Sequence, residues 1–246
     1  MPISDQHTVR AYDEELGKLA DTLARMSGLA ESQLANAIQA LSERDSELAA
    51  KVMNDDALVD ECENMINEQS IRLLALRSPV ADDLRLVIAA LKAAGDIERI
   101  ADHTANTAKR TLVLNQSPPI APTRSLVRLA RVVQGLLQET LDAYLNRDAE
   151  HALAARNRDQ EVDDLYSSLF REILTYMMED PRTITAGSHL MFIAKNIERI
   201  GDHATNIAEM TYYLVTGRAL DRQRPKRDTS SYEGAVAPEQ APPESL

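Results

Sequence analysis

The chain has 246 residues, enough for one large domain or two small ones with a buried core. Its formal net charge of -12 argues against nucleic-acid binding, which needs a basic surface to neutralise phosphates, and favours cations or basic protein surfaces as partners. The single cysteine, Cys62, excludes an intramolecular disulfide and a cysteine-based zinc site, and it indicates a reducing compartment such as the cytosol.

The first half of the chain predicts three helices. Apolar residues at alternating steps of three and four predict a helix from about residue 5 to residue 42. A second stripe predicts a helix over 46–77, which ends at Ser78-Pro79 because proline disfavours helical backbone in the residue before it. A third helix follows to about Asn115. The two stripes consist of Leu16, Leu19, Leu23, Met26, Ala30, Leu34, Ala37 and Leu41, and of Leu48, Val52, Val59, Ile66, Leu73 and Leu76.

A proline-rich segment separates this half from a second set of helices. The sequence NQSPPIAPT at 115–123 holds three prolines and cannot continue a helix. Three further helices are predicted at about 123–147, 149–179 and 183–216. Asp180-Pro181 takes the place that Ser78-Pro79 has in the first half, so the second half repeats the scheme of the first.

These helices predict an all-α fold for nearly the whole chain. Glycine is scarce, and alternating β-branched runs are absent from the sequence. We expect two tandem three-helix units, at 1–117 and 118–217, and a disordered proline-rich tail at 218–246. No apolar run reaches the roughly 18 residues of a membrane span, and the N-terminus lacks a signal-peptide pattern. We therefore expect membrane contact only through another protein or a surface helix.

The two halves also share a sequence motif. The stretch IERIADH at 97–103 returns one hundred positions later as IERIGDH at 197–203, and eight of the twelve positions from these starts are identical. Upstream, NDDALVDE at 54–61 aligns with NRDQEVDD at 157–164. A tandem duplication accounts for both similarities with one assumption.

Each unit carries two pairs of acidic residues four positions apart. A helix advances about 100° per residue, so the members of such a pair lie about 40° apart on one face. Like charges at this spacing cost about 0.2–0.5 kcal/mol when exposed, and more beside an apolar core, unless cations neutralise them. Clusters that offer only oxygen ligands suit Mg2+, Ca2+, Mn2+ and iron. The candidate metal ligands are Asp56 and Asp60, Glu98 and Asp102, Asp159 and Asp163, and Glu198 and Asp202.

Two other interpretations of these acids stay open. They could be solvated or paired with Arg99 and Arg199, which would make the protein a helical scaffold without metal. They could also belong to a carboxylate-bridged di-iron oxidase, although such bundles use Glu-x-x-His and no histidine here follows a glutamate at that spacing. His103 and His203 are offset by about 100° from the neighbouring aspartates, so we expect them beside the acid pairs but not as their main ligands.

The chain resembles the PhoU family, the phosphate-responsive regulators associated with the phosphate ABC transporter. The resemblance covers about residues 5–216 and rests on DDALVDECENMI, on the paired signatures ERIADH and ERIGDH, and on FIAKNIERIGDHATNIAEM. It implies two three-helix bundles related by a pseudo-twofold, with metal ions held by motifs that match the eight acids named above. The ion would be Mg, Mn, Fe, Ca or Zn.

The same resemblance implies a function. It predicts a cytoplasmic protein, often a homodimer, that restrains the phosphate-starvation response through contacts with the transporter ATPase subunit and a phosphate-sensing histidine kinase. A PhoU-like paralogue that serves another transporter is the alternative. The sequence contains no nucleophile with an adjacent base and no glycine-rich phosphate loop, so we expect a regulator and not an enzyme.

Overall fold

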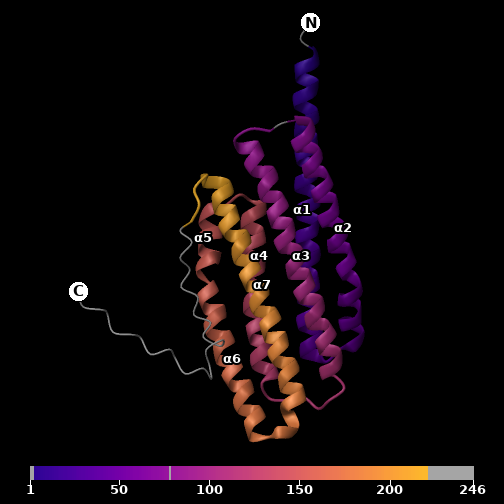
Figure 1. Cartoon of the computed structure of the whole chain (residues 1–246), viewed down its shortest axis with the longest axis vertical. Helices are drawn as coiled ribbons and strands as arrows, with labels where there is room; N and C mark the ends of the chain where they lie inside the picture. Colours follow the sequence, from indigo (N-terminus) through magenta and orange to yellow (C-terminus); the bar gives the residue numbers. More distant parts are fainter. Residues whose placement is uncertain (1–2, 78, 221–246) are drawn as a thin grey trace, which may run out of the picture.

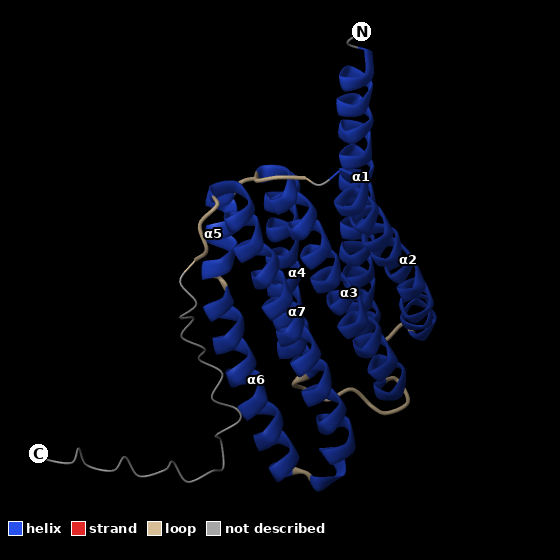
Figure 2. Cartoon of the chain, turned by 45° about the horizontal axis from the view of Figure 1, so that its top comes forward, coloured by secondary structure: helices blue, strands red, loops and turns tan. Residues whose placement is uncertain are grey.

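The computed structural model describes residues 3–77 and 79–220, except for the side chains of residues 3–11 and 77. In these two ranges the chain forms α-helices joined by short loops, with no strand (Figures 1 and 2). The elements are α1 (Ile3–Glu43), α2 (Ser46–Arg77), α3 (Asp82–Leu114), α4 (Thr123–Leu145), α5 (Ala149–Asn157), α6 (Asp159–Glu179), the short 3-10 helix η1 (Pro181–Thr183) and α7 (Ile184–Thr216).

The helices form two bundles that lie side by side (Figure 1). In the first bundle α2 packs against α1 and α3, and in the second α4, α5 and α6 pack against α7. The third helix of each bundle faces the other, because α3 packs along α7, and α1 also contacts α4. The expected all-α fold with two tandem three-helix bundles is therefore confirmed.

One expected helix is broken. The sequence predicts a single helix over 149–179, but α5 and α6 are separated at Arg158. There the backbone N–H of Arg158 bonds to the Ala155 carbonyl, and the N–H of Glu161 bonds to the Arg158 carbonyl, both in the tighter spacing of three residues. The Arg158 guanidinium also contacts Glu139 Oε1 at 2.6 Å, which ties this turn to α4. Neither glycine nor proline marks the break in the sequence.

Both expected proline breaks are confirmed. Helix α2 ends at Arg77 and α3 begins at Asp82, with Pro79 between them, whereas Ser78 lies outside the described residues. In the second bundle α6 ends before Asp180-Pro181, and the Asp180 side chain accepts a hydrogen bond from the backbone N–H of Arg182. In both bundles a proline therefore separates the last helix from the one before it.

The apolar stripe of α1 is buried as expected, apart from half-buried Leu16, and Cys62 is fully buried. The stripe of α2 extends beyond the packed part of the bundle, since Leu76 is 65% exposed. This residue lies in the last turn of α2, so its expected burial is wrong. The buried residues of both bundles form one continuous core, with a smaller alanine-rich cluster between α1, α2 and α3.

Three expectations concern the chain's boundaries and its relation to a membrane. The division into units at residues 117 and 217 stays a prediction. The expected tail at 218–246 follows α7, which ends at Thr216, but residues 221–246 lie outside the described part of the chain. Among the helices in 3–77 and 79–220, none is both long enough and apolar enough to cross a membrane.

Candidate functional site

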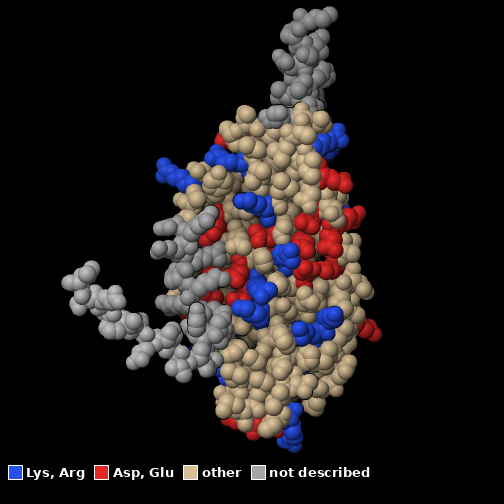
Figure 3. All heavy atoms as spheres, viewed as in Figure 1, with Lys and Arg blue, Asp and Glu red and all other residues tan. Residues whose placement is uncertain are grey.

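The first acid cluster is built by two neighbouring helices, α2 and α3 (Figure 3). Helix α2 supplies Asp56 and Asp60, and α3 supplies Glu98 and Asp102. Burial raises the pKa of Asp56; a hydrogen bond of 3.0 Å from Gln33 Nε2 lowers it, and the charges of Asp102 and Asp60 raise it again. Charges on both helices therefore act on one carboxylate, so Asp60 and Asp102 lie near enough to Asp56 to affect it.

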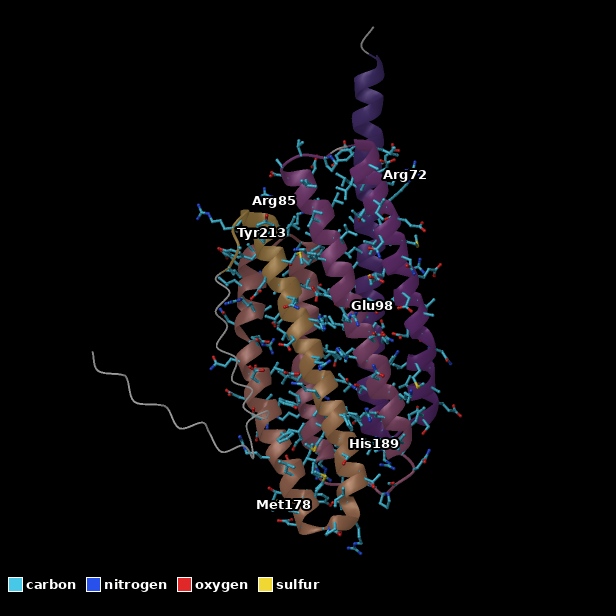
Figure 4. The ribbon with its side chains drawn as sticks, in the orientation of Figure 1. Arg72, Arg85, Glu98, Met178, His189 and Tyr213 are labelled. Carbon is cyan, nitrogen blue, oxygen red and sulfur yellow. The ribbon has the colours of Figure 1, made fainter. Side chains whose placement is uncertain are left out.

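Glu98 lies midway along α3 (Figure 4), and the charges of the neighbouring acids act on its carboxylate. Burial raises the pKa of Glu98, the charge of Asp102 raises it further, and Glu63 and Asp60 add smaller effects in the same direction. Arg99 acts in the opposite direction, with its Nε 3.5 Å from Glu98 Oε2. This arginine is 62% exposed, so water screens its charge and leaves an excess of negative charge in the cluster.

The second acid cluster is more deeply buried and has its own partners. Asp163 on α6 and Glu198 on α7 are only 7% and 4% exposed. Glu198 Oε2 lies 2.9 Å from the ammonium nitrogen of Lys195, one turn earlier on α7. The hydroxyl of Thr205 donates a hydrogen bond of 3.1 Å to Asp159 Oδ1 at the start of α6. Asp202 is half-buried on the same helix as Glu198. The two clusters therefore differ in burial and in neutralisation.

The donor atoms of the first cluster fit a hard divalent cation. They are carboxylate oxygens, and their mutual repulsion leaves the cluster in need of positive charge. Within residues 3–77 and 79–220, however, no three acidic, histidine or cysteine side chains already converge as a preformed metal centre. Metal binding by the eight predicted acids therefore stays a prediction.

His103 and His203 lie between the bundles. Their rings stack with 5.7 Å between centroids, where α3 packs along α7. His203 Nδ1 lies 2.8 Å from Asp96 Oδ1, which also accepts a hydrogen bond from the Asn206 amide. Burial lowers the pKa of His103, and the charges of His203 and Arg199 lower it further. These contacts place both histidines in the interface between the bundles, next to the acid pairs.

The duplicated architecture has a counterpart among known proteins. The sequence profile described as the PhoU domain matches residues 23–111 and matches residues 126–211 a second time. The chain belongs to the PhoU family. The first match runs from α1 to α3 and the second from α4 to α7, which agrees with the tandem duplication expected from the repeated IERI motif.

Several PhoU proteins resemble this chain over nearly their full length. It is 49% identical over 227 residues to a phosphate-specific transport system accessory protein PhoU homolog of Caulobacter vibrioides, covering 92% of this chain and 99% of that one. It is 47% identical over 235 residues to the homolog of Rhizobium meliloti, covering 95% and 99%. These relatives are named as accessory proteins and not as enzymes, in agreement with the expected class.

Crystal structures of PhoU proteins have the same fold. The PhoU structure from Pseudomonas aeruginosa aligns with a TM-score of 0.82 at 39% identity, covering 84% of this chain and all of that one. The phosphate transport system regulatory protein PhoU from Streptococcus pneumoniae aligns with a TM-score of 0.79 at 30% identity, covering 85% and 99%. The expected PhoU-like architecture is confirmed.

Within these PhoU repeats, sequence reasoning missed the residues that surround the acids. Glu63 follows Asp60 by three positions, so helical spacing could have identified it. The same argument applies to Lys195, which precedes Glu198 by three. Gln33 reaches the first cluster from α1, and Thr205 lies one turn beyond Asp202; nothing in the sequence pattern connects these two with the acids.

Proposed function

We propose that this protein is a cytoplasmic regulator of phosphate uptake and a negative regulator of the phosphate-starvation response. The observation that carries the proposal is the match of both repeats to the PhoU domain, together with near-complete coverage of relatives named for phosphate-specific transport. The similarity extends through both bundles and covers 99% of each of these two relatives.

The acid clusters would hold divalent cations. In the first cluster Asp56, Asp60, Glu98 and Asp102 would provide the ligands, and the ion would neutralise charges that repel each other across α2 and α3. The ion would be Mg, Mn, Fe, Ca or Zn, and the oxygen-only donor set favours the harder ions among these. A bound ion would supply charge compensation and rigidity to an exposed acidic face (Figure 3), and no catalytic step is assigned to it.

Partner proteins would bind this face. We propose that the transporter ATPase subunit and a phosphate-sensing histidine kinase bind the helical surface, and that two copies of the chain form a homodimer. The support is a surface rich in charge on a rigid bundle, which suits an adaptor. The protein would approach the membrane through these partners.

Metal binding can be tested by calorimetry. Replacement of Glu98, Asp102, Glu198 and Asp202 by alanine should abolish Mn2+ and Mg2+ binding by the full chain. The matched control replaces four exposed acids outside the two clusters, Asp21, Glu47, Glu172 and Glu179, and should bind the ions as the wild type does. Unchanged binding by the cluster variant contradicts the proposed metal sites.

Regulation can be tested in cells. A strain that lacks the gene and carries a phosphatase reporter should express the reporter in high phosphate, and the wild-type gene should restore repression. A silent reporter in the deletion strain contradicts the regulatory proposal. A third strain that carries the gene for the cluster variant tests whether repression of the reporter depends on the acids.

A further inference from the structure

The two acid clusters differ at one helical position. Helices α3 and α7 match with an offset of one hundred residues, which aligns Glu98 with Glu198 and Asp102 with Asp202. Three positions before the glutamate, the first repeat has Gly95 and the second has Lys195. The first cluster therefore has no side chain at the position from which the second receives a positive charge.

Lys195 supplies the second cluster with a cation from a side chain that is 38% exposed. Its Nζ lies 2.9 Å from Glu198 Oε2, and it sits above the ring of Tyr166 on α6, 5.1 Å from the ring centroid. Tyr166 is 4% exposed, and the Glu198 side chain is 5% exposed. A carboxylate this deeply buried needs a cation, and the ammonium group provides one from within the chain.

At the first cluster Arg99 is the neighbouring cation, and it interacts with the carboxylates more weakly than Lys195 does with Glu198. Arg99 is 62% exposed, with its Nε 3.5 Å from Glu98 Oε2 and its Nη1 4.0 Å from Asp102 Oδ2. These distances and the surrounding water make its attraction for the carboxylates small. The Glu98 side chain is 20% exposed, and that of Asp102 is 45% exposed, so an ion can reach them from solvent.

We propose that Lys195 is a built-in counter-cation that disfavours metal binding at the second cluster, so that a divalent cation loads the first cluster preferentially. The inference rests on the proposed metal-binding function and adds an asymmetry between the repeats. A metal ion at the second cluster must displace the ammonium from Glu198 and repels it, whereas an ion at the first cluster displaces only an exposed arginine contact.

The test uses the full chain and calorimetric titration with Mn2+. Each cluster is isolated by neutral substitutions of similar shape: Glu198→Gln with Asp202→Asn leaves the first cluster, and Glu98→Gln with Asp102→Asn leaves the second. We expect binding at the first cluster to be roughly 10- to 100-fold tighter than at the second, which is less than the effect of a fully buried ion pair because the Lys195 side chain is 38% exposed. Equal affinities overturn the asymmetry and leave the metal proposal intact.

Two reciprocal substitutions test the role of the lysine. Lys195→Met keeps the aliphatic stem without the charge, so it should tighten Mn2+ binding at the isolated second cluster at least about tenfold. Gly95→Lys should weaken binding at the isolated first cluster, and a Cβ at position 95 meets no atom within 4 Å. Lys92→Met, at an exposed position on α3, removes the same charge and should change neither affinity. Unchanged affinity in Lys195→Met contradicts the proposal.

Thermal unfolding gives a second readout and also checks folding. Without metal, Lys195→Met should lower the melting temperature, because the buried Glu198 carboxylate loses its partner. Mn2+ should raise the melting temperature of this variant more than that of the wild type, since binding to the folded state stabilises it. An equal rise in both proteins argues against the counter-cation. Absence of Mn2+ binding at both clusters in every variant overturns the inference together with the proposed metal sites.

Discussion

The imidazole rings of His103 and His203 stack across the contact between α3 and α7, with their planes inclined by 29°. The two residues occupy equivalent positions in the repeated motif. Around them the repeats differ, because His203 contacts the Asp96 carboxylate whereas Asn196 takes the equivalent position next to His103. The bundles therefore meet through their most similar segments, with a charged partner on one side and a neutral one on the other.

This arrangement predicts the effect of removing one ring. His203→Ala should lower the free energy of unfolding by about 1.5–3 kcal/mol, the usual contribution of a hydrogen bond that involves a charged group. The reason is that Asp96, whose side chain is 18% exposed, would lose its nearest partner at 2.8 Å. Chemical denaturation at neutral pH measures the change.

Asp96→Asn is the matched control, because it gives the first repeat the residue that the second repeat already has. The amide can still bond to the ring, so the loss should stay below about 1 kcal/mol. A loss as large as that of His203→Ala would indicate that the charge, and not the hydrogen bond, stabilises the interface.

The same substitution should have opposite effects at two glycines. Gly217 ends α7 with φ of 68°, and a Cβ there would collide with the Arg85 guanidinium, so Gly217→Ala should cost about 1–2 kcal/mol. Gly28 lies on the exposed side of α1 with open space around it, so Gly28→Ala should stabilise by about 0.5–1 kcal/mol. Denaturant midpoints compare the two variants, and a stabilised Gly217→Ala would show that this helix end is not left-handed in solution.

Asp148 should make the stability of α5 depend on pH. Its carboxylate accepts hydrogen bonds from the backbone N–H groups of Glu150 and His151 at 3.0 Å. The backbone hydrogen bond from His151 lowers the pKa of Asp148 most, and the hydrogen bond with the His151 ring lowers it further. A lowered pKa stabilises the fold above the unfolded value of about 3.9, and this contribution is lost as the pH falls through the folded value.

Asp148→Ala should therefore lower the melting temperature by roughly 2–4 °C at pH 7 and by less at pH 3. Circular dichroism at a series of pH values checks this. Asp148→Asn keeps an uncharged cap, so its melting temperature should lie between those of the wild type and the alanine variant at pH 7. A pH-independent difference between wild type and Asp148→Ala would rule out the carboxylate as the cause.

Cys62 should be unreactive in the folded protein. It is 0% exposed on α2, and burial is the largest cause that raises the pKa of its thiol. A thiol reagent should label it slowly in buffer and rapidly in denaturant. Cys62→Ser should cost about 1–3 kcal/mol because it buries a hydroxyl, and Cys62→Ala is the control without a polar group. Rapid labelling in buffer would show that α2 opens readily.

Helical periodicity and prolines predict most of this fold because they act locally. The apolar stripe of α1 is buried, and Pro79 and Pro181 separate helices where expected. The break at Arg158 escapes such reasoning, since it depends on contacts with Glu139 on another helix. The exposure of Leu76 in the last turn of α2 escapes it too, because periodicity gives the apolar face of a helix but not how far along the helix the packing extends.

For the candidate site, spacing predicts which acids share a face, but it does not predict their environment. The proximity of Asp56 to Asp102 requires that α2 and α3 pack together in register, and the repeat of both pairs supports that expectation. The neutralisation of Glu198 by Lys195 distinguishes the clusters, although the acid motifs themselves are the same. Repetition of a motif within one chain therefore does not imply equal surroundings for its acids.

The continuous core has a thermodynamic consequence for the duplicated chain. Because the buried side chains of both bundles form one cluster, neither bundle can lose its packing without exposing apolar surface of the other. The chain should then unfold in a single cooperative transition, and a ligand that binds one bundle should protect amide hydrogens from exchange in both. The two repeats would then have one common free energy of unfolding.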